Sequence, residues 1–321
     1  MIRFRALLFL LLLSPGRLGS DPPITQSNQP PRVALIGFTG NAKTPVERVI
    51  TEALAGDERI SIIDPGQVLA AVRGALYDGS INLSREEARR LGSAVGCDFF
   101  IIGKAELITR SDRENVPFVE ALVGVFIVDG RAGEMVLFDF IADKAASTES
   151  ASGSAAKDLG ARFSTYINEV VQWESSRGRK AALRSGELIE DMPDEDSPRR
   201  EGFKAPEFLN RVRPDYPEEA DRADVSATVE ARVVLSSDGV IGEVEIIRWA
   251  GYGLESTAVR AIKQLKFTPA IRNGEPVSVR ALIRYNFRRS RGADPITRES
   301  EKKTPERDLR QIFKPKLRPP V

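Results

Sequence analysis

The sequence contains no histidine and only one cysteine among its 321 residues. Histidine is the commonest general base and a frequent metal ligand, so its absence excludes Ser-His-Asp triads and most zinc sites. Cys97 cannot form an internal disulfide, and its neighbours in AVGCDFFIIG are apolar. We expect a buried, unreactive thiol, because nothing adjacent would lower its pKa. We therefore expect no catalytic residue, no metal and no cofactor.

The chain also lacks net charge, with 47 Lys and Arg against 46 Asp and Glu. No overall field draws such a protein to nucleic acid, so we expect no nucleic-acid partner. The apolar run at the N-terminus, Ala6–Leu13, covers eight residues. A helix that spans a bilayer needs about 20 apolar residues, so this run is too short.

Residues 1–20 nevertheless have the pattern of a secretory signal peptide. Arg3 and Arg5 precede the apolar run, and small residues follow it up to Ser20. We expect export to the periplasm, followed by a Pro-rich spacer over residues 21–31. Leu18 is a poor residue three positions before a cut after Ser20, so an uncleaved N-terminal anchor in the inner membrane stays open as an alternative.

Residues 32–175 alternate between buried-type strands and amphipathic helices, which predicts an α/β sandwich domain. GFTGNAKT, residues 37–44, resembles a phosphate-binding loop and raises the hypothesis of a nucleotide-dependent enzyme. However, Ala42 replaces the second glycine, and Pro45 disfavours helical geometry at Thr44. We interpret this segment as a helix start with Thr44 as its cap. Ser84 and Glu87 predict a capping box at a later helix.

The rest of the chain predicts a second, smaller unit. Residues 176–205 mix charge blocks of both signs and predict a flexible linker. Residues 206–287 combine a hairpin around Asp238-Gly239, an amphipathic helix and a final alternating strand, which is a ββαβ pattern. Residues 288–321 form a basic tail that we expect to be disordered. The predicted fold class is therefore α+β.

Trp249 stands out within the second unit. It lies at the end of a predicted strand and out of phase with the strand's apolar face. This position leaves two alternatives open, which are packing in the core and contact with a partner.

Several motifs in residues 206–287 occur together in a recognisable order. They are RVRPDYPEEA, the Asp-Gly hairpin, GYGLESTAVRAIKQLKFTPAIRNGEPV and the closing VRALIRYNF. In this order and spacing they closely resemble the C-terminal domain of the TonB family. The resemblance covers about 80 residues, from the Pro214-x-Tyr216-Pro217 start to the final strand.

The resemblance implies a protein-binding function. Domains of this family lie in the periplasm and bind the TonB box of outer-membrane transporters as a strand added to a sheet edge. Exposed edge strands offer unpaired main-chain groups for such pairing, and Arg280 and Arg284 would favour acidic partners. The residues assigned to this partner contact are Arg213, Pro214, Tyr216, Val279, Arg280, Ala281, Leu282, Ile283, Arg284, Tyr285 and Phe287.

Residues 32–175 are more weakly similar to CsgG-like domains and to the N-terminal domain of TolB, through RVALIGF, IIDPGQV and LGSAVGCDFFIIGKAEL. The chain departs from an energy transducer, because it has neither the transmembrane histidine that works with ExbB and ExbD nor a long Pro-rich rod. We expect a non-enzymatic periplasmic adaptor that binds outer-membrane transporters. The alternative is a non-energised envelope scaffold that self-associates as a homodimer through the same edge.

Overall fold

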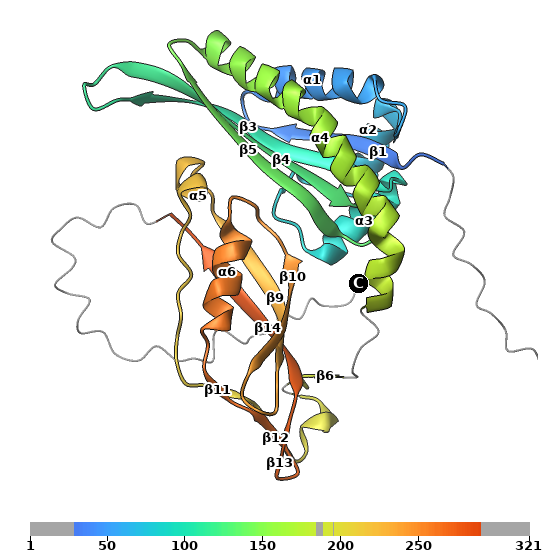
Figure 1. Cartoon of the computed structure of the whole chain (residues 1–321), viewed down its shortest axis with the longest axis vertical. Coiled ribbons are helices and arrows are strands. Elements are labelled where there is room, and N and C mark those ends of the chain that lie inside the picture. The colour runs from blue at the N-terminus through green and yellow to red at the C-terminus, as the bar shows by residue number, and fades with distance from the viewer. Residues whose placement is uncertain (1–28, 184–188, 195, 290–321) are drawn as a thin grey trace, which may run out of the picture.

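The computed structural model describes residues 29–183, 189–194 and 196–289. The expected signal peptide, most of the Pro-rich spacer and the tail from residue 290 lie outside the described residues. Within the described part, no helix is both long and apolar enough to cross a membrane. The described residues form two units, an N-terminal domain and a C-terminal unit, that lie one above the other (Figure 1). Both units mix helices and strands, which confirms the predicted α+β class.

The N-terminal domain is built on a five-stranded sheet in the order β2-β1-β3-β4-β5. Strand β1 runs parallel to β2 and β3, whereas β3, β4 and β5 are antiparallel neighbours. Strands β3 and β4 pair over 13 residues and form a long hairpin. The strand bounds are β1 Arg32–Thr39, β2 Ser61–Ile62, β3 Phe99–Ser111, β4 Pro117–Asp129 and β5 Glu134–Ala145.

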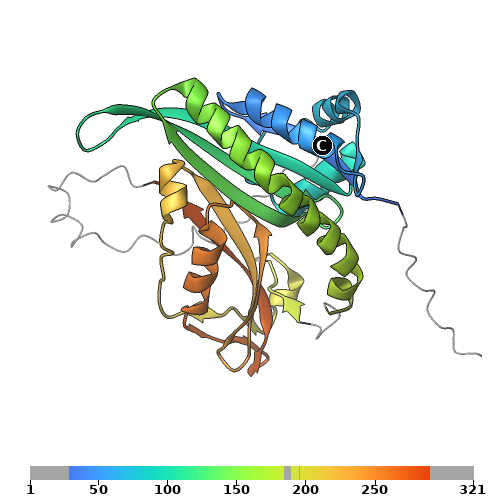
Figure 2. The ribbon, with the colours of Figure 1, turned by 45° about the horizontal axis from the view of Figure 1, so that its top comes forward.

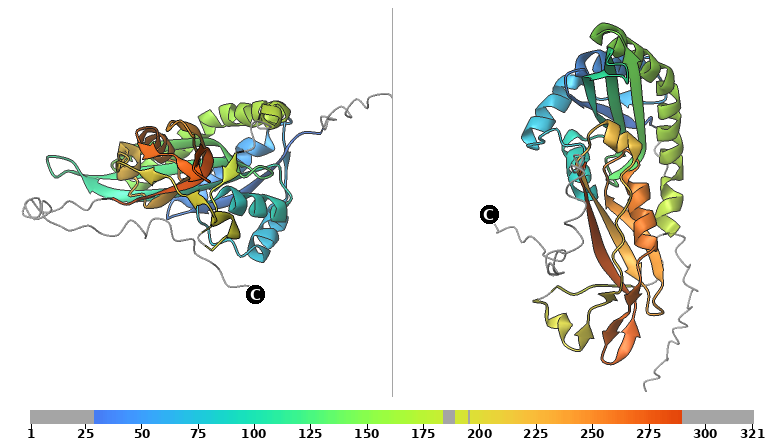
Figure 3. Two further views of the ribbon diagram at one scale, coloured as in Figure 1. Left: turned by 90° about the horizontal axis from the view of Figure 1, so that it is seen from below. Right: turned by 90° about the vertical axis from the view of Figure 1, so that its left-hand side faces the viewer.

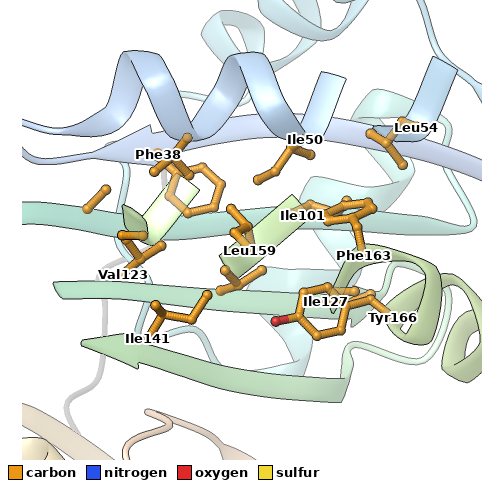
Figure 4. Packing of buried hydrophobic residues seen from close by; sticks show 14 of the residues in the cluster. Phe38, Ile50, Leu54, Ile101, Val123, Ile127, Ile141, Leu159, Phe163 and Tyr166 are labelled. Atoms are coloured by element: carbon orange, nitrogen blue, oxygen red, sulfur yellow. The ribbon is translucent and has the colours of Figure 1, made fainter. Parts of the chain in front are cut away.

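Both faces of this sheet are covered. Helices α1 and α4 cover one face, where Ile50 and Phe163 pack against strand residues such as Ile101 (Figure 4). Helices α2 and α3 cover part of the opposite face, where Leu91 packs with Phe100. The helix bounds are α1 Lys43–Ala55, α2 Pro65–Gly74, α3 Arg85–Val95 and α4 Thr148–Leu183. Cys97 is buried at this second face, and burial raises the pKa of its thiol to about 12, as the apolar surroundings predicted.

The helix starts agree only in part with the sequence patterns. The capping box at α3 is confirmed, because Ser84 accepts from the Glu87 amide and Glu87 accepts from the Ser84 amide. The prediction of Thr44 as the cap of α1 is wrong, because the helix already begins at Lys43. The main-chain amide of Ala42 donates to the Ala105 carbonyl at 3.0 Å, so strand β3 fixes this turn without a side-chain cap.

The C-terminal unit has the predicted ββαβ core. Its main sheet has the order β10-β9-β14-β6, and helix α6 packs Ile262 against the buried side chains of that sheet. Asn273 and Gly274 both have positive φ and join β12 to β13, as expected for an Asn-Gly hairpin. The main bounds are α5 Glu218–Arg222, β9 Ala227–Leu235, β10 Ile241–Arg248, α6 Leu254–Lys263 and β14 Val279–Phe287. The short strands are β8 Glu207–Phe208, β11 Phe267–Thr268, β12 Ala270–Arg272 and β13 Glu275–Val277.

Much of the expected flexible linker, residues 176–205, has regular structure. Helix α4 continues to Leu183, Glu190–Asp191 form strand β6, and Pro198–Arg200 form a 3₁₀ turn. Strand β7, Phe203–Lys204, pairs with β12. Arg272 of β12 contacts both the Glu190 carboxylate and the Phe203 ring. Low apolar content therefore did not prevent ordering here, because edge strands supplied main-chain partners.

The two units share one hydrophobic core. The C-terminal unit packs below the five-stranded sheet, on the face opposite α1 and α4 (Figures 2 and 3). Trp249 stacks on Phe126 of β4 with ring centroids 5.6 Å apart, and Tyr252 lies 4.8 Å from the Phe138 ring of β5. Trp249 and Tyr252 are each 2% exposed. The partner that Trp249 contacts is thus the chain's own N-terminal domain.

Polar contacts surround this core. The Asn82 side chain donates to the carbonyls of Thr228 and Trp249 at 2.9 and 2.6 Å, and it accepts from the Thr228 amide at 3.0 Å. Glu120 of β4, only 1% exposed, lies between the guanidinium groups of Arg110 and Arg222. A buried carboxylate of this kind needs both partners, so Arg222 ties α5 to the N-terminal sheet.

We expect Trp249→Ala to destabilise both units together, by about 3 kcal/mol relative to Trp249→Phe, because it leaves a cavity in the shared core. In both variants Trp173 of α4 is the single remaining tryptophan, since the chain has two. Its fluorescence during urea unfolding reports on the N-terminal domain. A Trp173 transition at the same urea concentration in both variants would contradict a shared core. Val240→Ala, at a 58% exposed position, is the control and should change stability by less than about 0.5 kcal/mol.

Candidate functional site: the edge of strand β14

Strand β14 alternates between a buried face and an exposed face. Val279, Ala281 and Phe287 are buried in the core, and Ile283 and Tyr285 are half-buried on the same side. Leu282 is 45% exposed on the opposite face. This alternation agrees with the sequence pattern and follows from the two-residue period of a strand.

One side of β14 is fully paired and the other is largely unpaired. All nine residues of β14 pair with β9. On the other side, β6 pairs only with Val279 and Arg280. Among the described residues, no strand pairs with residues 281–287 on that side.

The direction of the unpaired main-chain groups follows from one hydrogen bond. The Met192 amide donates to the Arg280 carbonyl at 3.0 Å, so Arg280 directs its main-chain groups away from β9. In an antiparallel pair this direction alternates along the strand. Leu282, Arg284 and Asn286 therefore point their N–H and C=O groups to the same side as Arg280. We call these three residues the open edge.

The arginines beside this edge already have partners. The Arg284 guanidinium donates to the Glu230 carboxylate of β9 at 2.6 Å. Glu230 also contacts Arg248 at 3.4 Å. Arg280 donates to the Ile189 carbonyl at 3.0 Å. The charge of Arg284 is thus matched within the molecule and the Arg280 guanidinium contacts a main-chain carbonyl, whereas the sequence alone suggested that both serve an acidic partner.

The stretch before α5 contains three of the expected contact residues. Arg213 is exposed and Pro214 is half-buried. Among the described residues, no hydrogen bond or ion pair joins either of them to β14. Tyr216 has a structural contact instead, because its hydroxyl donates to the carbonyls of Val225 and Ala220 at 2.5 and 3.2 Å. Burial, followed by the nearby carboxylates of Asp224 and Asp221, raises the pKa of this hydroxyl, so it stays protonated at neutral pH.

No sequence pattern predicts the role of residues 189–192. Ile189-Glu190-Asp191-Met192 has neither a strand nor a helix period, and β6 is only two residues long. The match with β14 depends on residues about 90 positions further along the chain, so no local pattern could reveal it. Within the described part of the chain, no group of three or more acidic or cysteine side chains is placed to hold a metal ion.

The family comparison agrees with the motif analysis. Residues 212–288 match the family model described as Gram-negative bacterial TonB protein C-terminal. This match confirms that the C-terminal unit is a TonB C-terminal-like domain. No curated protein matches the chain. The similarity of residues 32–175 to CsgG-like and TolB domains stays a prediction.

Solved structures give partial overlaps. The chain is similar to the hypothetical protein CT253 of Chlamydia trachomatis, with 16% identity over 44% of this chain and 98% of that chain, and a TM-score of 0.32. It is also similar to the TonB C-terminal domain of Pseudomonas aeruginosa, with 18% identity, coverage of 33% and 100%, and a TM-score of 0.25. The LpoB C-terminal domain of Salmonella enterica has 12% identity, coverage of 37% and 85%, and a TM-score of 0.26. The identification of the C-terminal unit rests on the family model.

Tyr216→Phe should lower the free energy of unfolding by about 1 kcal/mol, because it removes the hydroxyl that donates to Val225 and Ala220. Urea unfolding measures this loss, with exposed Asp215→Ala as the control that stays near the wild-type value. Unchanged stability of Tyr216→Phe would contradict a structural role for the hydroxyl.

Proposed function

We propose that this protein is a periplasmic adaptor whose TonB-like unit binds an extended segment of an outer-membrane transporter. The open edge of β14 would receive that segment as an added strand. The observation that carries the proposal is the position of this edge, because it is an unpaired stretch of sheet inside the region that matches the TonB family model. On this proposal residues 1–20 direct export, or remain as an anchor in the inner membrane.

Main-chain geometry supports strand addition at this position. A strand laid along the open edge can pair with Leu282, Arg284 and Asn286, and this pairing makes few demands on the partner's side chains. The exposed Leu282 side chain offers an apolar contact beside the ladder. The edge already accepts a parallel strand at Val279 and Arg280, where β6 is bound.

The same domain organisation favours an adaptor over an energised transducer. The shared core fixes the TonB-like unit to the N-terminal domain, so residues 176–205 do not give it the long reach of a rod. We propose that the N-terminal domain contacts another envelope component and that the chain has no catalytic activity. A role with ExbB and ExbD proteins lacks support, since the chain contains no histidine.

A second candidate function uses the same edge. Two copies of the chain could pair their open edges and form a homodimer that acts as an envelope scaffold. The supporting observation is the unpaired stretch at residues 281–287, because such edges readily pair with one another. Sedimentation analysis separates the candidates, since the scaffold requires a dimer that Leu282→Pro disrupts.

Leu282→Pro should weaken the binding of transporter-derived peptides to the full chain by about tenfold, because it removes one outward-facing N–H from the ladder. Proline fits an edge strand when the lost N–H faces outward. The probes are fluorescent peptides that copy the N-terminal segments of outer-membrane transporters from the same organism, and anisotropy gives the Kd.

Leu282→Ala is the matched control, because it keeps the N–H and removes the side chain. It should bind more tightly than Leu282→Pro. Ile283→Pro is unsuitable as a test, because the main-chain N–H of Ile283 points to β9. Its removal would break the pairing of β14 with β9. Equal binding by wild type, Leu282→Ala and Leu282→Pro would rule out strand addition at this edge.

A further inference from the structure

Residues 189–192 already occupy the beginning of the β14 edge. We call them the resident segment. In parallel register, Glu190 lies opposite Val279 and Asp191 lies opposite Arg280. Two hydrogen bonds to main-chain carbonyls hold them there: the Met192 amide donates to the Arg280 carbonyl and the Arg280 guanidinium donates to the Ile189 carbonyl, each at 3.0 Å.

Side chains add two further contacts. The Glu190 carboxylate lies 3.0 Å from the Arg272 guanidinium, and Met192 is half-buried against the core of the C-terminal unit. Pro193 follows and is buried. The resident segment therefore combines an acidic pair with an apolar anchor.

This attachment is short and weakly held. The ladder covers two residue pairs, and the Glu190 side chain is 42% exposed, so its ion pair adds little stability. Contacts of this kind open locally at a small cost in free energy, without unfolding of the domain. Strand β6 can therefore leave β14 while the pairing of β14 with β9 and the core stay intact.

We propose that the β14 edge is a strand-exchange site, in which the resident segment is displaced by a partner segment of the same chemistry. This inference rests on the proposed function. It adds the sequence pattern of the partner segment and identifies the resident segment as its competitor. The partner is an extended segment with two acidic residues followed by an apolar residue, running parallel to β14. It repeats the contacts of residues 189–192 at Val279 and Arg280 and continues along the open edge.

Competition has a quantitative consequence. A partner that pairs with Val279 and Arg280 can bind only when the resident segment has left these two residues. Its apparent Kd therefore equals the intrinsic Kd divided by the fraction of molecules in which the two residues are exposed. Weakening the resident segment therefore tightens partner binding, although no residue of β14 has changed.

The test uses the full chain and a fluorescein-labelled peptide that copies residues 187–194. Met192→Pro removes the N–H that donates to Arg280, so we expect the peptide to bind three- to tenfold more tightly than to wild type. Asp191→Pro is the matched control, because the Asp191 N–H points away from β14 in a parallel ladder. It should bind the peptide as wild type does. Thermal unfolding verifies that both variants are folded.

A second variant tests the same idea by locking the segment in place. Asp191→Cys with Arg280→Cys joins two residues that are paired across the ladder, and native Cys97 is buried and does not interfere. The oxidised protein should bind the transporter peptides more weakly than the same variant reduced with dithiothreitol, which is the reference because both forms lack the Arg280 guanidinium. Equal binding by the oxidised and reduced forms would show that the resident segment and the partner use separate sites.

The outcomes separate this inference from the proposed function. Equal peptide affinity in wild type, Met192→Pro and Asp191→Pro overturns strand exchange. If Leu282→Pro still weakens transporter peptides in that case, edge binding stands without exchange. If Leu282→Pro also has no effect, both ideas are wrong.

Discussion

The Tyr252 side chain lies directly over Gly124 of strand β4, where a Cβ atom would lie 2.4 Å from the tyrosine hydroxyl oxygen. Tyr252 itself has a positive φ and stands between Gly251 and Gly253, which also have positive φ. This conformation turns the ring into the N-terminal sheet, beside Phe138 and Phe140. The close approach of these rings produces the shared core, and the orientation of β14 relative to the N-terminal domain follows from it.

The shared core determines what the charged residues between the two units contact. Because the C-terminal unit is fixed in place, the chain that leaves α4 passes beside β14 and β12, whose edges need main-chain partners. Acidic Glu190 and aromatic Phe203 both meet Arg272 there. A segment whose composition is typical of a solvated linker thus becomes part of the surface that surrounds the candidate site.

Local sequence patterns predicted the elements well but not their contacts across the chain. The alternation in β14, the capping box at Ser84 and the Asn273-Gly274 hairpin depend on residues close in sequence, so they could be inferred without a structure. Strand β6 and the side of β14 that stays unpaired depend on residues far apart in sequence. Trp249 was ambiguous for the same reason, since its partner Phe126 belongs to the other unit. Family motifs located the β14 strand, but the direction of its main-chain groups needed the Met192 to Arg280 hydrogen bond.

The nine-residue ladder between β14 and β9 also has a mechanical consequence. Tension applied along β14 loads its hydrogen bonds in shear, so neighbouring bonds resist together and do not open one at a time. Strand β9 passes this load to the Asn82 side chain through Thr228, and β10 passes it through Trp249 into the five-stranded sheet. The tensile path therefore runs through the packed interior of both units.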